Sequence, residues 1–271
     1  MWSLKAWQGR FVDRTLPAGE RLRAYAGWCT AVEGNTTFYA TPARETVASW
    51  AAQTSPSFRF VPKLPRSVTH ESRLADVDLG EFWRAMEPLG PRAHAYWIQL
   101  PGSFGPGDLS VLEAFLHRLP SNFRYAVEVR HRSFFDDPRP LEAVLAKADA
   151  EWIPFDTTAF FASPPTSEAE RDAWSKKPRM PRRTTAMTDR PIIRYLGRDD
   201  TAATVAGWQP WVPIVAGWLR EGRSPTVFLH TPDNADAPAL ARQFHDDLRA
   251  LLPSLEPLPT AAPRDEPMTL F

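Results

Sequence analysis

Stretches with the pattern of buried strands alternate along this chain with stretches of helical periodicity. Apolar runs rich in β-forming residues lie at 31–38, 58–64, 94–100, 124–130, 151–156, 191–197 and 225–231. Between them, apolar residues recur at helical spacing at 43–53, 79–89, 107–119, 138–149, 167–176, 207–221 and 235–251. Such an alternation predicts parallel strands that are connected by crossover helices.

The number of these elements favours one α/β domain over residues 1–252, a TIM-type (β/α) barrel. The 271 residues suit a barrel of about 250 residues. A further helix is predicted at 16–27, before the first predicted strand, so the barrel has seven strands and lacks the first of eight. Two explanations stay open: either Met1 is an internal start, or the barrel has seven strands and an open edge.

Each predicted strand carries a polar residue at or near its carboxyl end. Barrel strands alternate between interior and helix-facing positions, and barrel active sites lie at the carboxyl ends. Assigning the more apolar set of each strand to the helices leaves an interior polar set, which we expect to line a functional site. The alternative is that these buried charges only neutralise one another.

The residue types in this set predict acid–base chemistry on an anionic substrate, for example a phosphorylated one, by a hydrolase or lyase. Lysine and arginine favour carboxylate or phosphate ligands, and paired carboxyl groups can serve as acid and base. The candidate catalytic residues are Glu33, Glu128 and His70, and the candidate substrate-binding residues are Asn35, Lys63, Gln99, Arg130, Asp156, Arg194 and His230.

No metal site and no cofactor are predicted, because the chain has no HExxH motif, no cysteine cluster and no glycine-rich phosphate loop. The single cysteine, Cys29, fits a reducing compartment and is expected to pack rather than to react. The longest apolar run, near 211–219, is too short to cross a membrane. We therefore expect a cytoplasmic protein.

The predicted connection at about 157–190 supports a different hypothesis, a non-catalytic protein that associates with DNA. Formal net charge is zero, so no global field attracts nucleic acid. The segment 176–183 nevertheless holds five basic residues and no acidic one, namely Lys176, Lys177, Arg179, Arg182 and Arg183. These residues either form a basic lid that recruits an anionic polymer or closes over the substrate, or they belong to a solvated loop whose charges balance acidic residues elsewhere.

The tail at 253–271 contains five prolines in 253–267 and is expected to be extended and flexible. It ends in Met268, Thr269, Leu270 and Phe271, which is similar to the peptide that bacterial DNA-handling proteins insert into the sliding clamp. Pro267 stands where that peptide has glutamine. Clamp binding and docking on the protein's own surface are the two alternatives.

Several stretches resemble the YecE-like family called domain of unknown function 72, over Trp2 to about Leu252. They are VEGNTTFYATP, FRFVPKLPRSVTH, IQLPGSF, YAVEVRHRSFF, IIRYLGR and VFLHTPDNADAPALA. The resemblance implies a TIM-type barrel and no known reaction. It matches eight of the candidate site residues to family motifs, namely Glu33, Asn35, Lys63, His70, Gln99, Glu128, Arg130 and Arg194.

This chain departs from the family pattern near the last two strands. Leu196 stands where the family commonly has histidine, and His230 and Thr231 replace a pair of asparagines. A role for those two later positions is therefore in doubt. Trp2 matches a tryptophan that follows the family's first strand, in line with a missing first strand.

Overall fold

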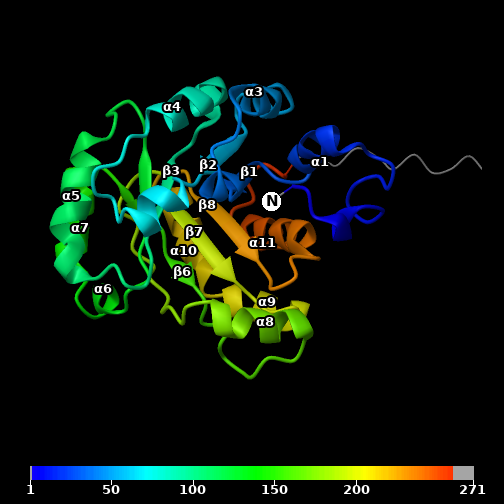
Figure 1. Cartoon of the computed structure of the whole chain (residues 1–271). Coiled ribbons are helices and arrows are strands. Elements are labelled where there is room, and N and C mark those ends of the chain that lie inside the picture. The colour runs from blue at the N-terminus through cyan, green and yellow to red at the C-terminus, as the bar shows by residue number, and fades with distance from the viewer. Residues whose placement is uncertain (1, 259–271) are drawn as a thin grey trace, which may run out of the picture.

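Short parallel strands form the centre of the molecule, and helices surround them (Figure 1). The structure is a computed structural model and describes residues 2–258. Its strands are β1 Ala31–Gly34, β2 Arg59–Pro62, β3 Tyr96–Gln99, β4 Tyr125–Glu128, β5 Glu151–Trp152, β6 Phe155–Asp156, β7 Ile192–Leu196 and β8 Thr226–His230. All seven predicted strand positions are confirmed, and the one predicted at 151–156 is split into β5 and β6.

The predicted helices are confirmed with small shifts at their ends. They are α1 Arg21–Ala26, α3 Arg44–Ala52, α4 Gly80–Met86, α5 Leu109–Arg118, α7 Arg139–Lys147, α8 Glu168–Lys176, α10 Trp211–Arg220 and α11 Ala237–Leu251. Four further helical segments were not predicted, namely α2 Thr36–Tyr39, α6 Ser133–Asp136, α9 Thr201–Trp208 and a π-helical turn at Ser67–Glu71. All four begin within five residues of the carboxyl end of a strand, α2 after β1, the π-helical turn after β2, α6 after β4 and α9 after β7.

The predicted TIM-type barrel is wrong, because the described strands form three small parallel sheets and no closed barrel. The sheets are β1-β2, β3-β4-β5 and β6-β7-β8. Between the first two sheets there are only isolated bridges, such as Lys63 with Trp97. Between the last two, Pro154 separates β5 from β6; it has no N–H to continue a ladder, and its carbonyl oxygen accepts a hydrogen bond from the Arg194 N–H on the β7 side.

The strand arrangement is also open between β1 and β8. No hydrogen-bonded pairing joins these two strands in residues 2–258. A cavity of about 600 Å³ lies there, with Ala31 and Glu33 on one side and Val227 and Leu229 on the other. This opening is a second reason why the strands do not close into a barrel.

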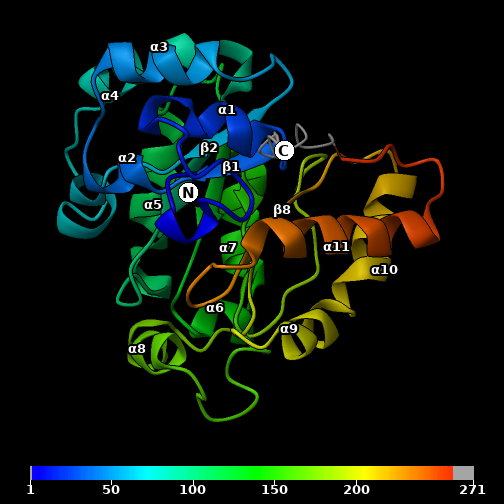
Figure 2. The same cartoon turned by 90° about the vertical axis from the view of Figure 1, so that its right-hand side faces the viewer.

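Apolar side chains fill the spaces between the strands and the surrounding helices. The largest core cluster packs α3, α4, α5 and α7 against β1 to β5. A second cluster includes Ile193, Trp208, Trp211 and Phe244, and it packs β7 against α9, α10 and α11. Figure 2 shows α10 and α11 next to each other on one side of the molecule. The two clusters hold the strands against the surrounding helices.

The chain beyond α11 turns back on that helix as far as the structure describes it. Arg249 Nε donates a hydrogen bond to the Leu255 carbonyl, and His245 Nε2 lies 2.7 Å from the Glu256 carbonyl oxygen. The clamp-like residues Met268, Leu270 and Phe271 lie outside the described residues. In residues 2–258, no helix has both the length and the apolar character needed to cross a membrane.

Candidate functional site

The interior side chains of the strands form an apolar layer and, two residues further along, a polar layer. Because side chains alternate along a strand, residues two apart share a face. The buried apolar residues are Val61, Trp97, Ala126, Ile192 and Phe228, and the polar residues that follow them are Lys63, Gln99, Glu128, Arg194 and His230. The predicted alternation is confirmed in these strands, and it brings the polar side chains together at the carboxyl ends.

Arg194 joins two glutamates that come from strands far apart in the sequence. Its Nη2 lies 3.4 Å from Glu33 Oε1, and its Nη1 lies 3.2 Å from Glu128 Oε2. Both glutamates are buried, and Glu128 is fully buried. The Arg194 guanidinium also faces the Phe155 ring at 4.3 Å, and its Nε has no hydrogen-bond partner in the described chain. The centre of the site is therefore an ion network in apolar surroundings.

The ammonium group of Lys63 contacts three side chains of this network. Its Nζ lies 2.5 Å from Glu33 Oε1, 3.1 Å from Asn35 Oδ1 and 2.9 Å from Gln99 Oε1. An ammonium group has three donors, so these three acceptors satisfy it. The side chain is almost wholly buried. Lys63 therefore positions Glu33, Asn35 and Gln99, and has no donor left for a ligand.

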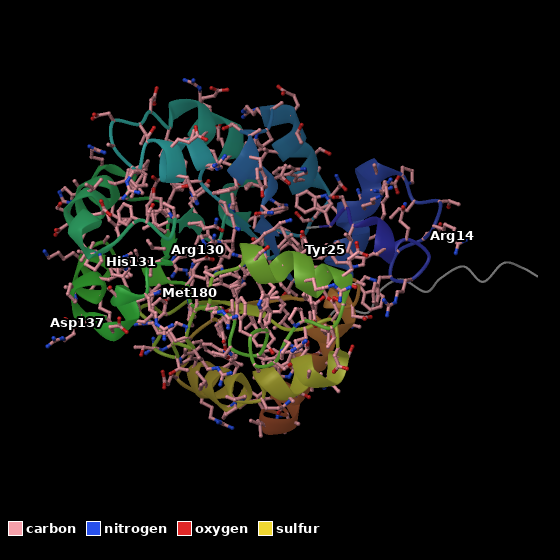
Figure 3. All side chains as sticks on the ribbon, turned by 60° about the horizontal axis from the view of Figure 1, so that its bottom comes forward. Arg14, Tyr25, Arg130, His131, Asp137 and Met180 are labelled. Carbon is pink, nitrogen blue, oxygen red and sulfur yellow. The ribbon has the colours of Figure 1, made fainter. Side chains whose placement is uncertain are left out.

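Arg130 lies at the outer side of the network and remains partly open to solvent. Its Nε and Nη2 both lie 2.8 Å from one oxygen, Glu128 Oε1, and its side chain is 20% exposed. Figure 3 labels Arg130 near the middle of the molecule. Two nitrogen atoms of Arg130 thus contact the same carboxylate oxygen, and its remaining N–H groups can donate hydrogen bonds to a ligand.

The two predicted site histidines occupy different places. His230 Nε2 is 2.7 Å from Glu33 Oε2, and its Nδ1 faces the Asn234 side chain at 3.2 Å. His70 packs edge-on against Phe38, and its Nδ1 lies 2.9 Å from Thr69 Oγ1. No hydrogen bond reaches His70 Nε2 from residues 2–258. His230 is therefore engaged on both nitrogens, whereas His70 has one available.

The pKa values follow from burial and from these partners. Burial alone would raise the pKa of Glu33, but Arg194, Lys63 and His230 together hold it well below its usual range. Arg130, Arg194 and Lys63 likewise outweigh burial and lower the pKa of Glu128. Burial lowers the pKa of Lys63 to about 8, despite Glu33. Both carboxyl groups are therefore ionised at neutral pH.

The two histidines are neutral at neutral pH. Burial, with Arg130 and Arg66 nearby, lowers the pKa of His70 to about 4. Burial also lowers the pKa of His230, against the opposite influence of Glu33. A neutral imidazole has one nitrogen that can accept a proton. His70 is thus a half-buried neutral base beside the ion network.

Asp156 is the one predicted site residue that the structure places apart from this group. Ile153 and Phe155 are the interior residues here, so Asp156 faces away from the site. Its Oδ2 accepts hydrogen bonds from Arg182 Nε and from Trp211 Nε1, each at 2.7 Å. Asp156 therefore ties the long connection to α10.

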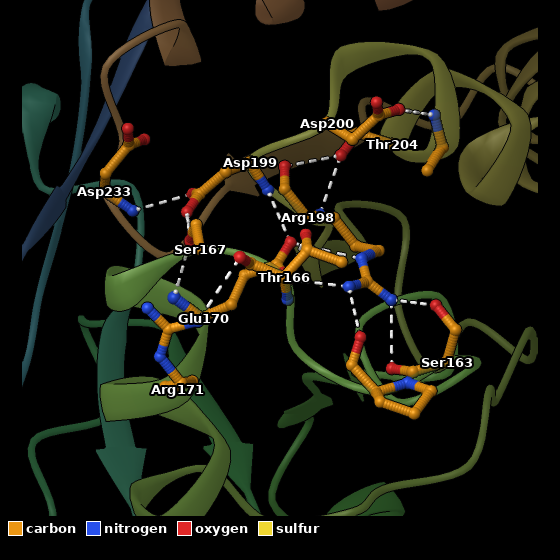
Figure 4. A network of polar contacts seen from close by, with 12 residues as sticks. Ser163, Thr166, Ser167, Glu170, Arg171, Arg198, Asp199, Asp200, Thr204 and Asp233 are labelled. Atoms are coloured by element: carbon orange, nitrogen blue, oxygen red, sulfur yellow. Dashed lines mark hydrogen bonds and ion pairs between the residues drawn. The ribbon is translucent and has the colours of Figure 1, made fainter.

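A second buried ion network holds the beginning of α8 (Figure 4). Glu170 is fully buried and accepts hydrogen bonds from Arg198 Nη2 at 2.6 Å, from the Thr166 N–H at 2.7 Å and from the Asp199 N–H at 3.1 Å. Arg198 also donates to the Pro164 carbonyl. Burial would raise the pKa of Glu170, but Arg198 and these N–H groups lower it to about 2. The long connection is thereby fixed to the segment after β7.

These lowered carboxyl pKa values predict a loss of stability in acid. Glu33, Glu128 and Glu170 have folded pKa values below the ordinary 4.5. Their contribution to the free energy of unfolding is therefore complete above pH 4.5 and is lost as pH falls below it. Urea unfolding measured from about pH 7 down to about pH 3 should show stability falling below pH 4.5. Equal stability at pH 5 and pH 3 would contradict this assignment.

Other groups offer less to a ligand. Cys29 is half-buried, and burial raises the pKa of its thiol, which disfavours a reactive thiolate. In the part of the chain that the structure describes, no three His, Cys, Asp or Glu side chains are grouped so that they could hold a metal ion. The site therefore consists of the strand-end network with His70.

Two residues beside the site were not assigned to it from the sequence. Tyr39, at the end of α2, is 73% exposed and lies close enough to Arg194 to affect its pKa. Lys177, directly after α8, lies near Arg130 and Arg194. One feature of the sequence could have assigned Lys177 to the site. It lies in a long connection that follows a strand, and such a connection is expected to lie over the strand's carboxyl end.

Fold and site together define a parallel α/β protein with a buried, charged site at the carboxyl ends of its strands. The chain belongs to the family described as protein of unknown function DUF72, whose model matches residues 1–264. This confirms the resemblance seen in the sequence motifs.

Curated relatives and solved structures agree with this membership. UPF0759 protein YecE of Escherichia coli K12 is 40% identical over 243 residues, which are 88% of this chain and 89% of that protein. The crystal structure of a DUF72 family protein from Thermotoga maritima has a TM-score of 0.64 at 22% identity, over 92% of this chain and 96% of the other. One from Enterococcus faecalis has a TM-score of 0.65 at 19% identity, over 87% and 94%. At these identities the two structures support the fold alone.

Proposed function

We propose that this protein is an enzyme that performs acid–base chemistry on an anionic substrate at the carboxyl ends of its strands. The observation that carries the proposal is the charge of the site. Glu33 and Glu128 contribute two negative charges, whereas Lys63, Arg130, Arg194 and Lys177 contribute four positive charges. A half-buried site with two excess positive charges favours an anion.

His70 is the proposed proton-transfer group. Its Nε2 is available, its pKa of about 4 keeps it neutral, and it lies within the electrostatic influence of Arg130. An anion held by Arg130 would place the substrate beside this base. Glu33 and Glu128, the other candidate catalytic residues, then act as fixed negative charges that hold Arg194, Lys63 and Arg130 in position.

The remaining predicted site residues have supporting roles in this proposal. Asn35 and Gln99 are held by Lys63, and His230 is held by Glu33, so each presents an ordered polar group beside the network. Ordered groups of this kind orient a substrate at little further entropic cost. Hydrolase and lyase chemistry both fit this arrangement.

The test looks for deuterium exchange at carbon, which a lyase that abstracts a C–H proton would cause, and for product formation, which hydrolysis of an ester would cause. Phosphate monoesters and carboxylates would be incubated with the protein in D₂O and followed by NMR for exchange or product formation. For a substrate found in this way, His70→Gln should slow turnover by about 100-fold or more. His117→Gln, at an exposed histidine of α5, is the matched control and should have no effect. Full turnover by His70→Gln would refute the role of His70.

The DNA-associated alternative stays a prediction. Four of its five basic residues have partners within the protein: Lys176 with Asp172, Arg182 with Asp156, Arg183 with Glu142, and Arg179 over the Phe161 and Trp174 rings. No observation therefore favours this alternative over the enzyme. Steeply salt-dependent DNA binding that is lost on neutralising 176–183 would favour it.

A further inference from the structure

Lys177 differs from the other basic residues of the long connection. Those four residues have ion-pair or ring partners, as described above, whereas the Lys177 side chain has no hydrogen bond and no ion pair within residues 2–258. It is half-buried. Its Nζ is not among the buried polar atoms that lack a partner, so solvent reaches the ammonium group and an anion could bind there.

The backbone around Lys177 is tied to the strand beneath the site. The Lys177 N–H donates to the Ala173 carbonyl and ends α8. Three residues later, the Met180 N–H donates to Thr157 Oγ1 at 2.8 Å, and Thr157 Oγ1 in turn donates to the Pro178 carbonyl at 3.0 Å. Thr157 is fully buried. The segment that follows Lys177 is therefore anchored directly after β6.

The same strand supports the two arginines of the site. Thr157 lies two residues after Phe155, and the Phe155 ring faces the guanidinium groups of Arg194 at 4.3 Å and Arg130 at 5.8 Å. Anchoring of the connection at Thr157 thus holds the segment that follows Lys177 close to the strand that carries Phe155. Burial, together with Arg194 and Arg130, lowers the pKa of Lys177, which agrees with this position.

We infer that Lys177 and Arg130 form a subsite for a doubly charged oxyanion of the phosphate monoester class. The inference rests on the proposed function and specifies its substrate. Arg130 offers the planar fork of its guanidinium, and Lys177, on the connection anchored after β6, offers a point charge. The second arginine, Arg194, forms ion pairs with both Glu33 and Glu128, so it adds positive charge near the subsite without contacting the ligand.

The charge of the site distinguishes a monoester from other anions. Glu33 and Glu128 balance two of the four positive charges, which leaves two. A phosphate monoester carries close to two negative charges at neutral pH because its second pKa is about 6. A phosphodiester, the group found in nucleic acid, carries one and would leave a half-buried cation unpaired.

The test compares methyl phosphate with dimethyl phosphate, a diester of similar shape and lower charge. Binding to the wild-type chain would be measured by NMR titration at about pH 7, where the monoester is mostly a dianion and Lys63, with a pKa of about 8, is still mostly charged. Methyl phosphate should bind more tightly than dimethyl phosphate. Lys177→Ala should weaken methyl phosphate binding by about 10- to 100-fold, the loss of one charge-assisted hydrogen bond.

Lys176→Ala is the matched control, since Lys176 is the adjacent lysine, is 65% exposed and pairs with Asp172. It should bind methyl phosphate as the wild type does. Equal binding by Lys177→Ala and wild type, equal binding of the two phosphates, or no binding of methyl phosphate to wild type would each overturn the inference.

The outcome also separates this inference from the proposed function. His70→Gln should keep its affinity for methyl phosphate, because His70 is assigned to proton transfer. If Lys177→Ala binds normally while His70→Gln loses turnover, the subsite is wrong and the enzyme stands. If Lys177→Ala binds weakly while His70→Gln turns over normally, the subsite stands and the role of His70 is wrong.

Discussion

Arg194→Met is expected to lower the free energy of unfolding by about 3–5 kcal/mol at neutral pH, because it removes one partner from a buried ion network. Arg194 contacts Glu33 at 3.4 Å and Glu128 at 3.2 Å, and its side chain is 9% exposed. Methionine has a similar reach and no charge. The variant leaves two buried carboxylates with Lys63 and Arg130 as their remaining ion-pair partners and with His230 beside Glu33.

The loss should be smaller in acid. Without Arg194, the pKa values of Glu33 and Glu128 rise toward and above the ordinary range, because burial is no longer opposed as strongly. The two groups then take up protons at a higher pH and become neutral. Urea unfolding of variant and wild type at about pH 7 and about pH 4 would measure the difference at each pH.

Arg190→Met is the matched control for this experiment. Arg190 is about half exposed, and its contact with Asp189 is 3.7 Å long. An exposed pair of this kind contributes about 0–1 kcal/mol. If Arg194→Met lowered the free energy of unfolding no more than Arg190→Met does, Arg194 would not stabilise the network. The proposal that excess positive charge at the site binds an anion would then lose its support.

Much of the site could be predicted because it depends on the two-residue period of strands. The sequence shows an apolar residue followed two positions later by a polar one, as in Val61 and Lys63 or Trp97 and Gln99. That spacing places both on one face whatever the pairing of the strands. The convergence of Lys63, Gln99, Glu128 and Arg194 was therefore predictable.

The pairing between strands was not predictable in the same way. Whether β8 bonds to β1 depends on residues almost 200 positions apart, which no local pattern records. Pro154 was visible within the predicted strand, and its missing N–H explains the change of partner from β4 to β7. Assigning the more apolar set of this strand to the helices placed Asp156 in the site, whereas Ile153 and Phe155 are the interior residues.

Close approach of the backbone explains the early end of β1. A Cβ on Gly34 would lie 2.7 Å from Pro62 Cα, so this position needs glycine. Thr37 Oγ1 then lies 2.8 Å from the Gly34 carbonyl oxygen and 2.7 Å from that of Lys63, which favours the helical turn of α2 over a longer strand. These contacts join distant residues, so the predicted strand at 31–38 ran four residues too far.

The roles of the five basic residues in the long connection also depended on tertiary contacts. In the sequence they form one cluster, and nothing separates Lys176 from Lys177. In the structure Lys176 points to Asp172 on the same helix, whereas Lys177 follows the end of that helix beside Arg130 and Arg194. The same cluster therefore supports a site residue and several anchors.

Arg198→Met is expected to lower the free energy of unfolding by about 3–5 kcal/mol as well, and also to weaken the Lys177 subsite. Arg198 and Glu170 are 5% and 0% exposed, and their pair fixes the first turn of α8. Since Lys177 follows the last turn of α8, loosening this helix should weaken methyl phosphate binding.

Adding Glu170→Gln to Arg198→Met distinguishes two causes of the lower stability, an unpaired buried carboxylate and the lost packing of the arginine side chain. In the double variant Glu170→Gln/Arg198→Met no carboxylate is left unpaired, so the double variant should be more stable than Arg198→Met alone. Arg171→Met, at an exposed arginine of the same helix that donates to the Thr166 carbonyl, should change stability by less than about 1 kcal/mol. A double variant no more stable than Arg198→Met would mean that packing of the arginine stem, rather than the ion pair, holds the connection over the site.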